Sequence, residues 1–210
     1  MIYRQPFSGA YHRVETSEKV VALTFDDGPD PIYTTQLLEI LDRHQIKATF
    51  FMVGQKIEEH PNLAAGVYAR GHELGNHSYS HQRMLLKSFP FIRHEIDRTD
   101  LLLRSLGVSG DIHFRTPFVA PSLGLPFILW QRRKKNIHFD VDSRDWEVQD
   151  PPSVMQRVLD NVRPGSIILL HDGGGERLGT VRAVEMMVPA LNQQDFRFVT
   201  VSQLLTYAGR

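Results

Sequence analysis

Hydrophobic positions follow two alternating periods along almost the whole chain. Short apolar runs rich in β-branched residues are typical of buried strands, and apolar residues recurring every three or four positions are typical of helices. The expected strands are 20–25, 48–53, 73–76, 112–115, 137–141, 166–170 and 196–201. The expected helices are 33–44, 57–70, 91–106, 123–135, 151–161 and 181–193, with a short helix after the last strand.

This alternation amounts to about seven strand–helix units, and it predicts an α/β protein whose parallel sheet is covered by helices. Closure of the strands into a (β/α) barrel is favoured at a length of 210 residues, and an open doubly wound sheet is the alternative. No linker or low-complexity segment separates the units. We therefore expect a single domain.

Composition excludes several classes of protein. The 24 basic residues balance the 24 acidic ones, so the chain lacks the positive charge typical of nucleic-acid binding. The basic run at residues 132–135 is interpreted as the solvated end of a helix. The absence of cysteine excludes disulfides, thiol catalysis and cysteine-based zinc sites. No apolar run is long enough to span a bilayer, and the first residues are polar, unlike a signal peptide.

Reactive side chains follow the expected strands at the point where each strand ends. Because the carboxyl ends of parallel strands share one rim of a barrel, where active sites lie, we expect these side chains to converge. They are Asp26 and Asp27, His77 and His81, Arg115, Asp142 and Asp145, and His171. The glycine triplet at 173–175 lacks the spacing of a phosphate-binding loop and is interpreted as a flexible loop.

Asp26 and Asp27 stand between a strand and a Gly-Pro turn, which can bring both carboxylates to one site. The alternative is that one of them caps the turn. His77 and His81 are four residues apart, and on a helical turn such side chains lie side by side. Two imidazoles and one carboxylate form the three-ligand set of a catalytic zinc or related divalent metal.

Arg115 and His171 each have a functional and a structural interpretation. A buried arginine at a strand end needs an anion, and Asp26 is the candidate, whereas a surface ion pair is the alternative. His171 leaves a buried strand at the rim, where Asp145 and Trp146 offer it a carboxylate and an apolar wall. Otherwise His171 is a core histidine.

Together these motifs resemble the polysaccharide deacetylase family, whose catalytic unit is the NodB homology domain of carbohydrate esterase family four. The matching segments are TFDDGP at 24–29, GNHSYSH at 75–81, RTPF at 115–118, DSRDW at 142–146 and LLHD at 169–172. They occur in the family's order, so we assign residues 18–210 to the catalytic domain and 1–17 to an N-terminal extension. The third motif departs from the family's RPPYG: Thr116, Phe118 and Val119 replace a proline, the tyrosine and the glycine. A valine where a glycine needs positive φ must reshape the loop.

The resemblance implies a distorted (β/α) barrel and a metal bound by Asp27, His77 and His81. The metal is expected to be zinc, with Co²⁺, Ni²⁺ or Mn²⁺ as substitutes. The resemblance also implies roles for the other residues. Asp26 is the general base, oriented by Arg115. His171 is the general acid, and Asp145 tunes its pKa. The Phe118 N–H stabilises the oxyanion, and Trp146 and Leu169 line the acetyl pocket.

The resemblance also implies a substrate and a compartment. The expected activity is removal of N-acetyl groups from N-acetylglucosamine in chitin oligomers or peptidoglycan, with acetylated xylan as a rarer substrate. Two alternatives stay open: a metal hydrolase acting on a small amide or imide, and a catalytically dead carbohydrate-binding homologue. We expect a monomer outside the cell or in its envelope, or else in the cytoplasm.

Overall fold

The central strand of the sheet is β3 (Val20–Asp26), in which every residue is buried. In the computed structural model, which describes residues 2–4, 10–120 and 124–209, it pairs in parallel with β4 (Thr49–Met52) and β8 (Ile167–His171). β5 (Glu73–Asn76) extends the sheet beyond β4, and β7 (Val141–Asp142) extends it beyond β8. A parallel strand covered on both faces is a continuous apolar run, as β3 is.

A second, smaller sheet continues the ring of strands. β1 (Ile2–Arg4) runs antiparallel to β2 (Ala10–Val14), and β2 pairs in parallel with β6 (Asn136–Ile137). Single bridges at Phe114 connect the end of β5 to β6, and a bridge from Arg13 to Ser166 connects β2 to the start of β8. The strands thereby close into an irregular, distorted barrel, so the predicted α/β class with mostly parallel strands is confirmed.

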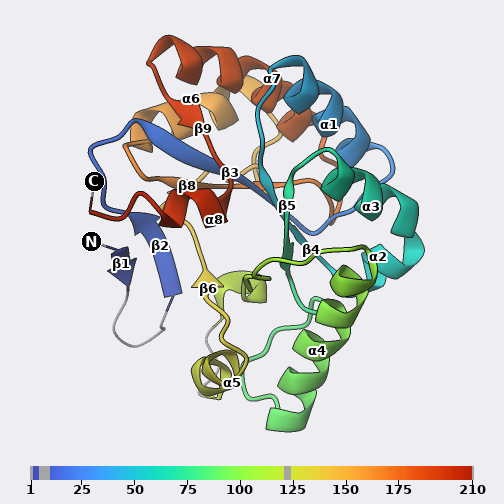
Figure 1. Cartoon of the computed structure of the whole chain (residues 1–210). Coiled ribbons are helices and arrows are strands. Elements are labelled where there is room, and N and C mark those ends of the chain that lie inside the picture. Colours follow the sequence, from blue (N-terminus) through green and yellow to red (C-terminus); the bar gives the residue numbers. More distant parts are fainter. Residues whose placement is uncertain (1, 5–9, 121–123, 210) are drawn as a thin grey trace.

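Helices cover the outside of the strands (Figure 1). α7 (Leu178–Gln193) packs against both α1 (Tyr33–Arg43) and α6 (Pro151–Asn161) beside β3 and β8. The others are α2 (Gly54–Glu59), α3 (Pro61–Ala69), α4 (Phe89–Ser105), the short 3₁₀ helix η1 (Pro117–Val119), α5 (Leu125–Gln131) and α8 (Val201–Leu205). The largest hydrophobic core lies between these helices and the sheet.

Several expected elements are shorter or interrupted. The single helix expected at 57–70 is wrong, because Pro61 has no N–H and begins a new helix, α3, after α2 ends. The expected strand at 112–115 is reduced to the bridge at Phe114. The last expected strand is only β9 (Arg197–Phe198), which pairs with the start of β3.

The boundary between extension and catalytic domain stays a prediction. Within the first 17 residues, Ala10 and Val14 of β2 are fully buried, and Val14 belongs to a core cluster that also contains Ile137 and Ile167. This strand is therefore packed into the same fold as the residues that follow it.

The basic run after α5 is engaged by acidic residues of α4. Arg132 forms an ion pair with Asp97, and Lys134 lies 2.8 Å from the carboxylate of Asp100. This run belongs to the contact between two helices. Among the described residues, no helix is long and apolar enough to cross a membrane.

Candidate active site

The two adjacent carboxylates leave the end of β3 in different directions. Asp26 ends the strand and is buried, whereas Asp27 adopts a left-handed conformation with φ of 77°. Successive side chains of a regular strand point to opposite faces. The left-handed Asp27 breaks this alternation, so that both carboxylates line one pocket.

The histidine pair lies on an irregular loop after β5 and not on a helical turn. Ser78 and His81 have positive φ values of 66° and 53°. The Asn76 side chain accepts a hydrogen bond from the Ser78 N–H, and the Ser78 hydroxyl accepts one from the His81 N–H. These bonds fold the loop back on itself and bring the His77 and His81 ring centroids to 4.8 Å.

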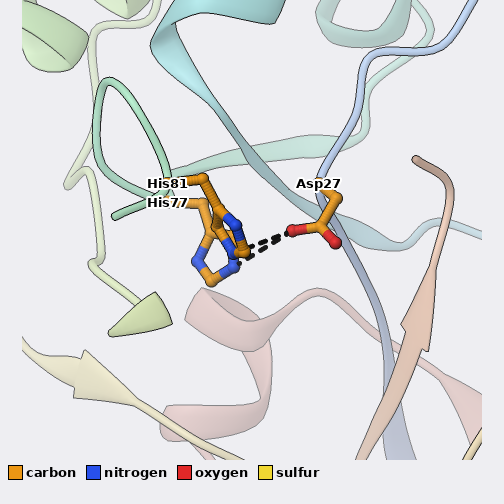
Figure 2. Close-up of side chains that lie close together, drawn as sticks. All are labelled: Asp27, His77 and His81. Carbon is orange, nitrogen blue, oxygen red and sulfur yellow. Dashed lines mark ion pairs between the residues drawn. The ribbon is translucent and has the colours of Figure 1, made fainter. Parts of the chain in front are cut away.

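Asp27, His77 and His81 point toward one another (Figure 2). Their potential ligand atoms all lie within 4.8 Å of one another, and Asp27 Oδ1 is 3.5 Å from His77 Nε2 and 3.1 Å from His81 Nε2. The His77 Nδ1–H donates to the carbonyl of Arg115 at 2.9 Å, which leaves the Nε2 lone pair facing the carboxylate. Burial lowers the pKa of His77 to about 3, so the imidazole is neutral.

This arrangement fits a divalent cation. Asp27 Oδ1 is buried and has no hydrogen-bond partner among the described residues, although the lone pair of a neutral imidazole faces it. Two electron-rich atoms facing each other in a buried site need a positive charge between them. A donor set of two histidines and one carboxylate is that of catalytic zinc and related metals.

Asp26 is paired with a fully buried arginine. Arg115, 1% exposed, places its guanidinium 2.7 Å from Asp26 Oδ1 and also donates to the Thr24 hydroxyl and the carbonyls of Ile137 and His138. Burial raises the pKa of the Asp26 carboxyl above its usual value, and the Arg115 charge opposes the rise. The result is a fixed carboxylate that is more basic than an exposed aspartate.

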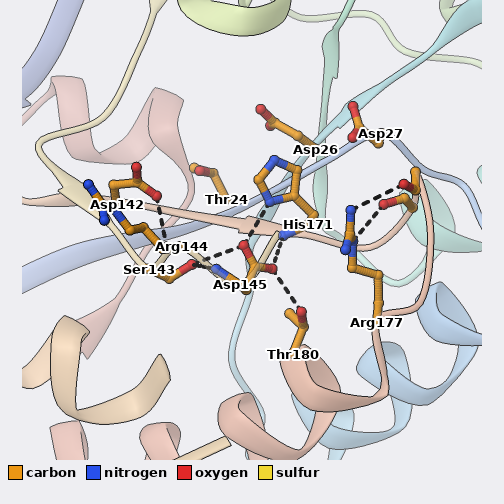
Figure 3. Close-up of polar contacts among 12 residues, drawn as sticks. Thr24, Asp26, Asp27, Asp142, Ser143, Arg144, Asp145, His171, Arg177 and Thr180 are labelled. Carbon is orange, nitrogen blue, oxygen red and sulfur yellow. Dashed lines mark hydrogen bonds and ion pairs between the residues drawn. The ribbon is translucent and has the colours of Figure 1, made fainter. Parts of the chain in front are cut away.

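His171, at the end of β8, is held by Asp145 (Figure 3). Its Nδ1–H donates to Asp145 Oδ1 at 2.8 Å, and Asp145 also accepts bonds from the His171 N–H and the Thr180 hydroxyl. Burial alone would lower the pKa of His171, but the hydrogen bond and charge of Asp145 outweigh it and raise the pKa to about 9. His171 therefore carries a proton at neutral pH.

These groups share one open pocket of about 640 Å³. Of the candidate residues, Asp145 alone is not part of its wall and lies behind His171. Leu169 is buried at the pocket wall, whereas Phe118 and Trp146 are about half exposed.

The loop that departs from the family motif is strained. Phe118 and Val119 both have positive φ, of 57° and 53°. Positive φ is a marked outlier for a β-branched residue and costs of order 1–3 kcal/mol. Val119 thus takes up the glycine-like conformation in spite of its side chain. The Phe118 ring lies 4.7 Å from the His81 ring, which holds the loop against the histidine pair.

The sequence analysis missed several residues that build or line the pocket. Arg83 stacks over the Phe118 ring, and Phe139 forms another part of the wall. Gly174, which lies against Asp27, and Arg177 complete the wall. The glycine triplet directly after His171 was the available signal, because glycines beside a reactive residue permit a close backbone approach.

Comparison with known proteins assigns the family. The sequence profile of the polysaccharide deacetylase family matches residues 13–124. The chain belongs to this family. A peptidoglycan-N-acetylglucosamine deacetylase from Bacillus cereus is 37% identical over 92% of both chains. A chitooligosaccharide deacetylase from Azorhizobium caulinodans is 32% identical over 90% of this chain and 95% of its own. As a family member, the protein is a hydrolase that removes acetyl groups.

Solved structures agree with the fold of this deacetylase. The Bc1960 peptidoglycan N-acetylglucosamine deacetylase has a TM-score of 0.90 at 31% identity, covering 95% of this chain and 96% of its own. BA3943, a CE4 family pseudoenzyme from Bacillus anthracis, has a TM-score of 0.86 at 28% identity, covering 93% of this chain and 68% of its own. Fold similarity therefore extends to a deacetylase and to a pseudoenzyme alike.

Proposed function

We propose that this deacetylase hydrolyses the N-acetyl groups of N-acetylglucosamine residues in peptidoglycan or chitooligosaccharides and releases acetate. The observation that carries this proposal is the convergence in one pocket of a buried basic carboxylate, a protonated histidine and a cation-binding triad. The substrate class is supported by the names of the two relatives. Substrates in the envelope or outside the cell favour those compartments, and we propose a monomer as the working unit.

Asp27, His77 and His81 would hold the metal, which we propose to be zinc or a divalent ion that replaces it. When bound, such an ion polarises the acetyl carbonyl and lowers the pKa of water from 15.7 toward ~7. Asp26 then takes the proton of the attacking water. Arg115 contributes by holding the Asp26 carboxylate and leaving its second oxygen, Oδ2, directed toward the triad, 3.6 Å from His77 Nε2.

His171 is placed to protonate the leaving amine. Its Nδ1 is engaged by Asp145, so the proton available to the substrate is on Nε2. An amine is a poor leaving group until it is protonated, and general acid catalysis contributes about 10²–10⁴-fold. The proposed base and acid are the last residues of β3 and β8, which are neighbouring strands, and Asp26 and His171 are register partners. They therefore reach the same acetamide together.

The developing oxyanion and the acetyl methyl need separate partners. The Phe118 N–H donates no backbone hydrogen bond within the described part of the chain, so this N–H can donate to the oxyanion. Such donors are worth about 3 kcal/mol. Leu169 and Trp146 offer the apolar wall for the methyl group.

The alternatives make different predictions about this site. A small amide or imide hydrolase needs a closed pocket, whereas half-exposed Phe118 and Trp146 leave this one open to a longer chain. A dead homologue would lack a ligand or a proton-transfer group, whereas both are present here. Both observations favour polymer deacetylation.

The direct test is acetate release from N-acetylglucosamine oligomers and from purified peptidoglycan, with and without exhaustive chelation. We expect release that is abolished by the chelator and restored by added zinc, with Asp26→Asn as the inactive control. Full activity after chelation would contradict the metal-dependent mechanism. Activity on small cyclic imides but not on either glycan would favour the small-amide alternative.

A further inference from the structure

The glycine triplet after His171 forms a turn that packs directly against Asp27. Gly174 and Gly175 have positive φ values of 75° and 142°, and Gly173 is buried. A β-carbon on Gly173 would lie 2.5 Å from the Asp27 carbonyl oxygen, and one on Gly174 would lie 2.6 Å from Asp27 Oδ2. The segment interpreted from sequence as flexible is therefore a close-fitting wall.

The two oxygens of Asp27 have different surroundings. Oδ1 faces His77 and His81, whereas Oδ2 faces the backbone of Gly174. Since the two oxygens belong to one rigid carboxylate, whatever limits Oδ2 also sets the direction of Oδ1. Asp27 has positive φ, so its backbone conformation is one that needs support from its neighbours.

Arg177 holds this turn in place. Its side chain is 6% exposed and donates to three carbonyls of the turn, those of Gly173 at 2.8 Å, Gly174 at 3.3 Å and Glu176 at 3.0 Å. Figure 3 shows the dashed hydrogen bonds of the Arg177 guanidinium, with Asp27 labelled above it. The guanidinium thereby crosslinks the turn that packs against Asp27.

We propose that Gly174 and Arg177 are positioning residues for the metal ligand Asp27. Gly174 limits how far the Asp27 carboxylate can rotate away from the two histidines. Arg177 holds the backbone of residues 173–176 in place, so that Gly174 stays against the carboxylate. This inference rests on the proposed metal site, and it assigns a role to a segment outside the ligand set. Residues that orient metal ligands typically contribute 10–100-fold to metal affinity.

The sharpest test is Gly174→Ala compared with Gly71→Ala. Both glycines have nearly the same φ, 75° and 80°, so both alanines carry a similar backbone strain. A β-carbon on Gly71 meets only Lys47, at 3.7 Å, whereas one on Gly174 displaces the movable Asp27 carboxylate. We expect Gly174→Ala to weaken Zn²⁺ binding about 10–100-fold, measured by competition with a chromophoric chelator. Gly71→Ala should bind Zn²⁺ with wild-type affinity, although its loss of thermal stability should be similar to that of Gly174→Ala.

Two further measurements make the test independent of folding and of catalysis. The visible absorption of the Co²⁺-loaded protein should change in Gly174→Ala and not in Gly71→Ala. If Gly174→Ala fails to fold, the Arg177→Lys and Arg177→Met variants test the inference instead. We expect the Zn²⁺ affinity to fall from the wild type to Arg177→Lys, and further to Arg177→Met. Wild-type affinity in Gly174→Ala, or in both Arg177 variants, would overturn the inference. A wild-type protein that binds no zinc would instead overturn the proposed metal site itself.

Discussion

Two neighbouring aspartates in this site have opposite environments. Asp26 is bound to the Arg115 guanidinium, whereas Asp27 Oδ1 has no hydrogen-bond partner among the described residues and faces two imidazoles. Environments that separate two carboxylates in this way assign them different roles. The difference makes Asp26 the proton acceptor and Asp27 the metal ligand in our proposal.

Asp26→Asn should therefore keep the metal and lose most of the rate, by about 10²–10⁴-fold, because asparagine has nearly the same shape and cannot accept the proton. Asp27→Asn should lose metal affinity. The measurement is bound zinc together with acetate release for both variants. If Asp26→Asn loses the metal while Asp27→Asn keeps it, the two roles are reversed.

His171 offers a test that separates proton donation from other roles. His171→Ala should lose most of its rate on an acetylated amino sugar, whose amine needs a proton to leave. It should keep far more of its rate on an activated acetate ester, whose leaving group needs none. The comparison is kcat/KM on the two substrates. Equal losses would mean that His171 acts in some other way, for example by holding the loop.

The pH profile tests the His171–Asp145 pair. Asp145 raises the pKa of His171 to about 9, so the protonated acid is present below that pH and is lost as pH rises through it. Asp145→Asn should move the alkaline limb of kcat/KM to lower pH, because the stabilising charge is gone. The acidic limb, assigned to Asp26, should stay in place. An unchanged alkaline limb would contradict the assignment of His171 as the acid.

At the scale of elements, helices and strands with a clear periodicity of apolar residues were predicted from the sequence. Segments whose conformation depends on contacts with other parts of the chain were not. The helices at 33–44 and 151–161 were predicted to within a residue, since each has a clear apolar face. The strand at 112–115 was overpredicted because its composition is strand-like, but its pairing is limited to isolated bridges at Phe114. The form of the loop at 77–81 was not predicted, because the spacing of the histidines alone cannot reveal the positive φ of Ser78 and His81.

A buried glutamate on α4 holds the histidine loop in that irregular form. Glu95 Oε2 accepts the N–H groups of Tyr79 and Ser80 at 3.1 and 2.8 Å, and its Oε1 accepts the Ser80 hydroxyl at 2.9 Å. Glu95 is 2% exposed, so a lost acceptor would leave buried donors without water. Through this contact, α4 fixes the conformation of the loop that bears His81.

Glu95→Gln should lower the free energy of unfolding by about 1–3 kcal/mol, because an amide replaces part of a charged acceptor. Urea denaturation measures the loss. Glu185→Gln is the matched control: Glu185 forms an exposed ion pair with Arg43, and such pairs contribute at most about 1 kcal/mol. Similar losses of unfolding free energy in both variants would show that Glu95 contributes no more to stability than an exposed ion pair does.

At the scale of the whole molecule, the site exists because distant segments meet. The rim argument predicted that residues following β3, β5 and β8 would converge, and the pocket contains them. Sequence could not give the role of the turn behind Asp27 or of Glu95, because neither a glycine triplet nor a glutamate on a helix indicates by itself which residue it contacts. Their contacts depend on how the loops pack once the strands are paired.

A metal bound at this rim should stabilise the entire fold, since its ligands come from loops after β3 and β5 and are brought together only by folding. At a zinc concentration 100-fold above Kd, the gain is about 2.7 kcal/mol. For a chain of this size that corresponds to a rise in Tm of roughly 5–10 °C. Thermal unfolding with and without zinc measures it. His81→Ala should abolish the rise and Asp26→Asn should retain it, because Asp26 is outside the proposed ligand set. A rise that persists in His81→Ala would place the zinc elsewhere on the protein.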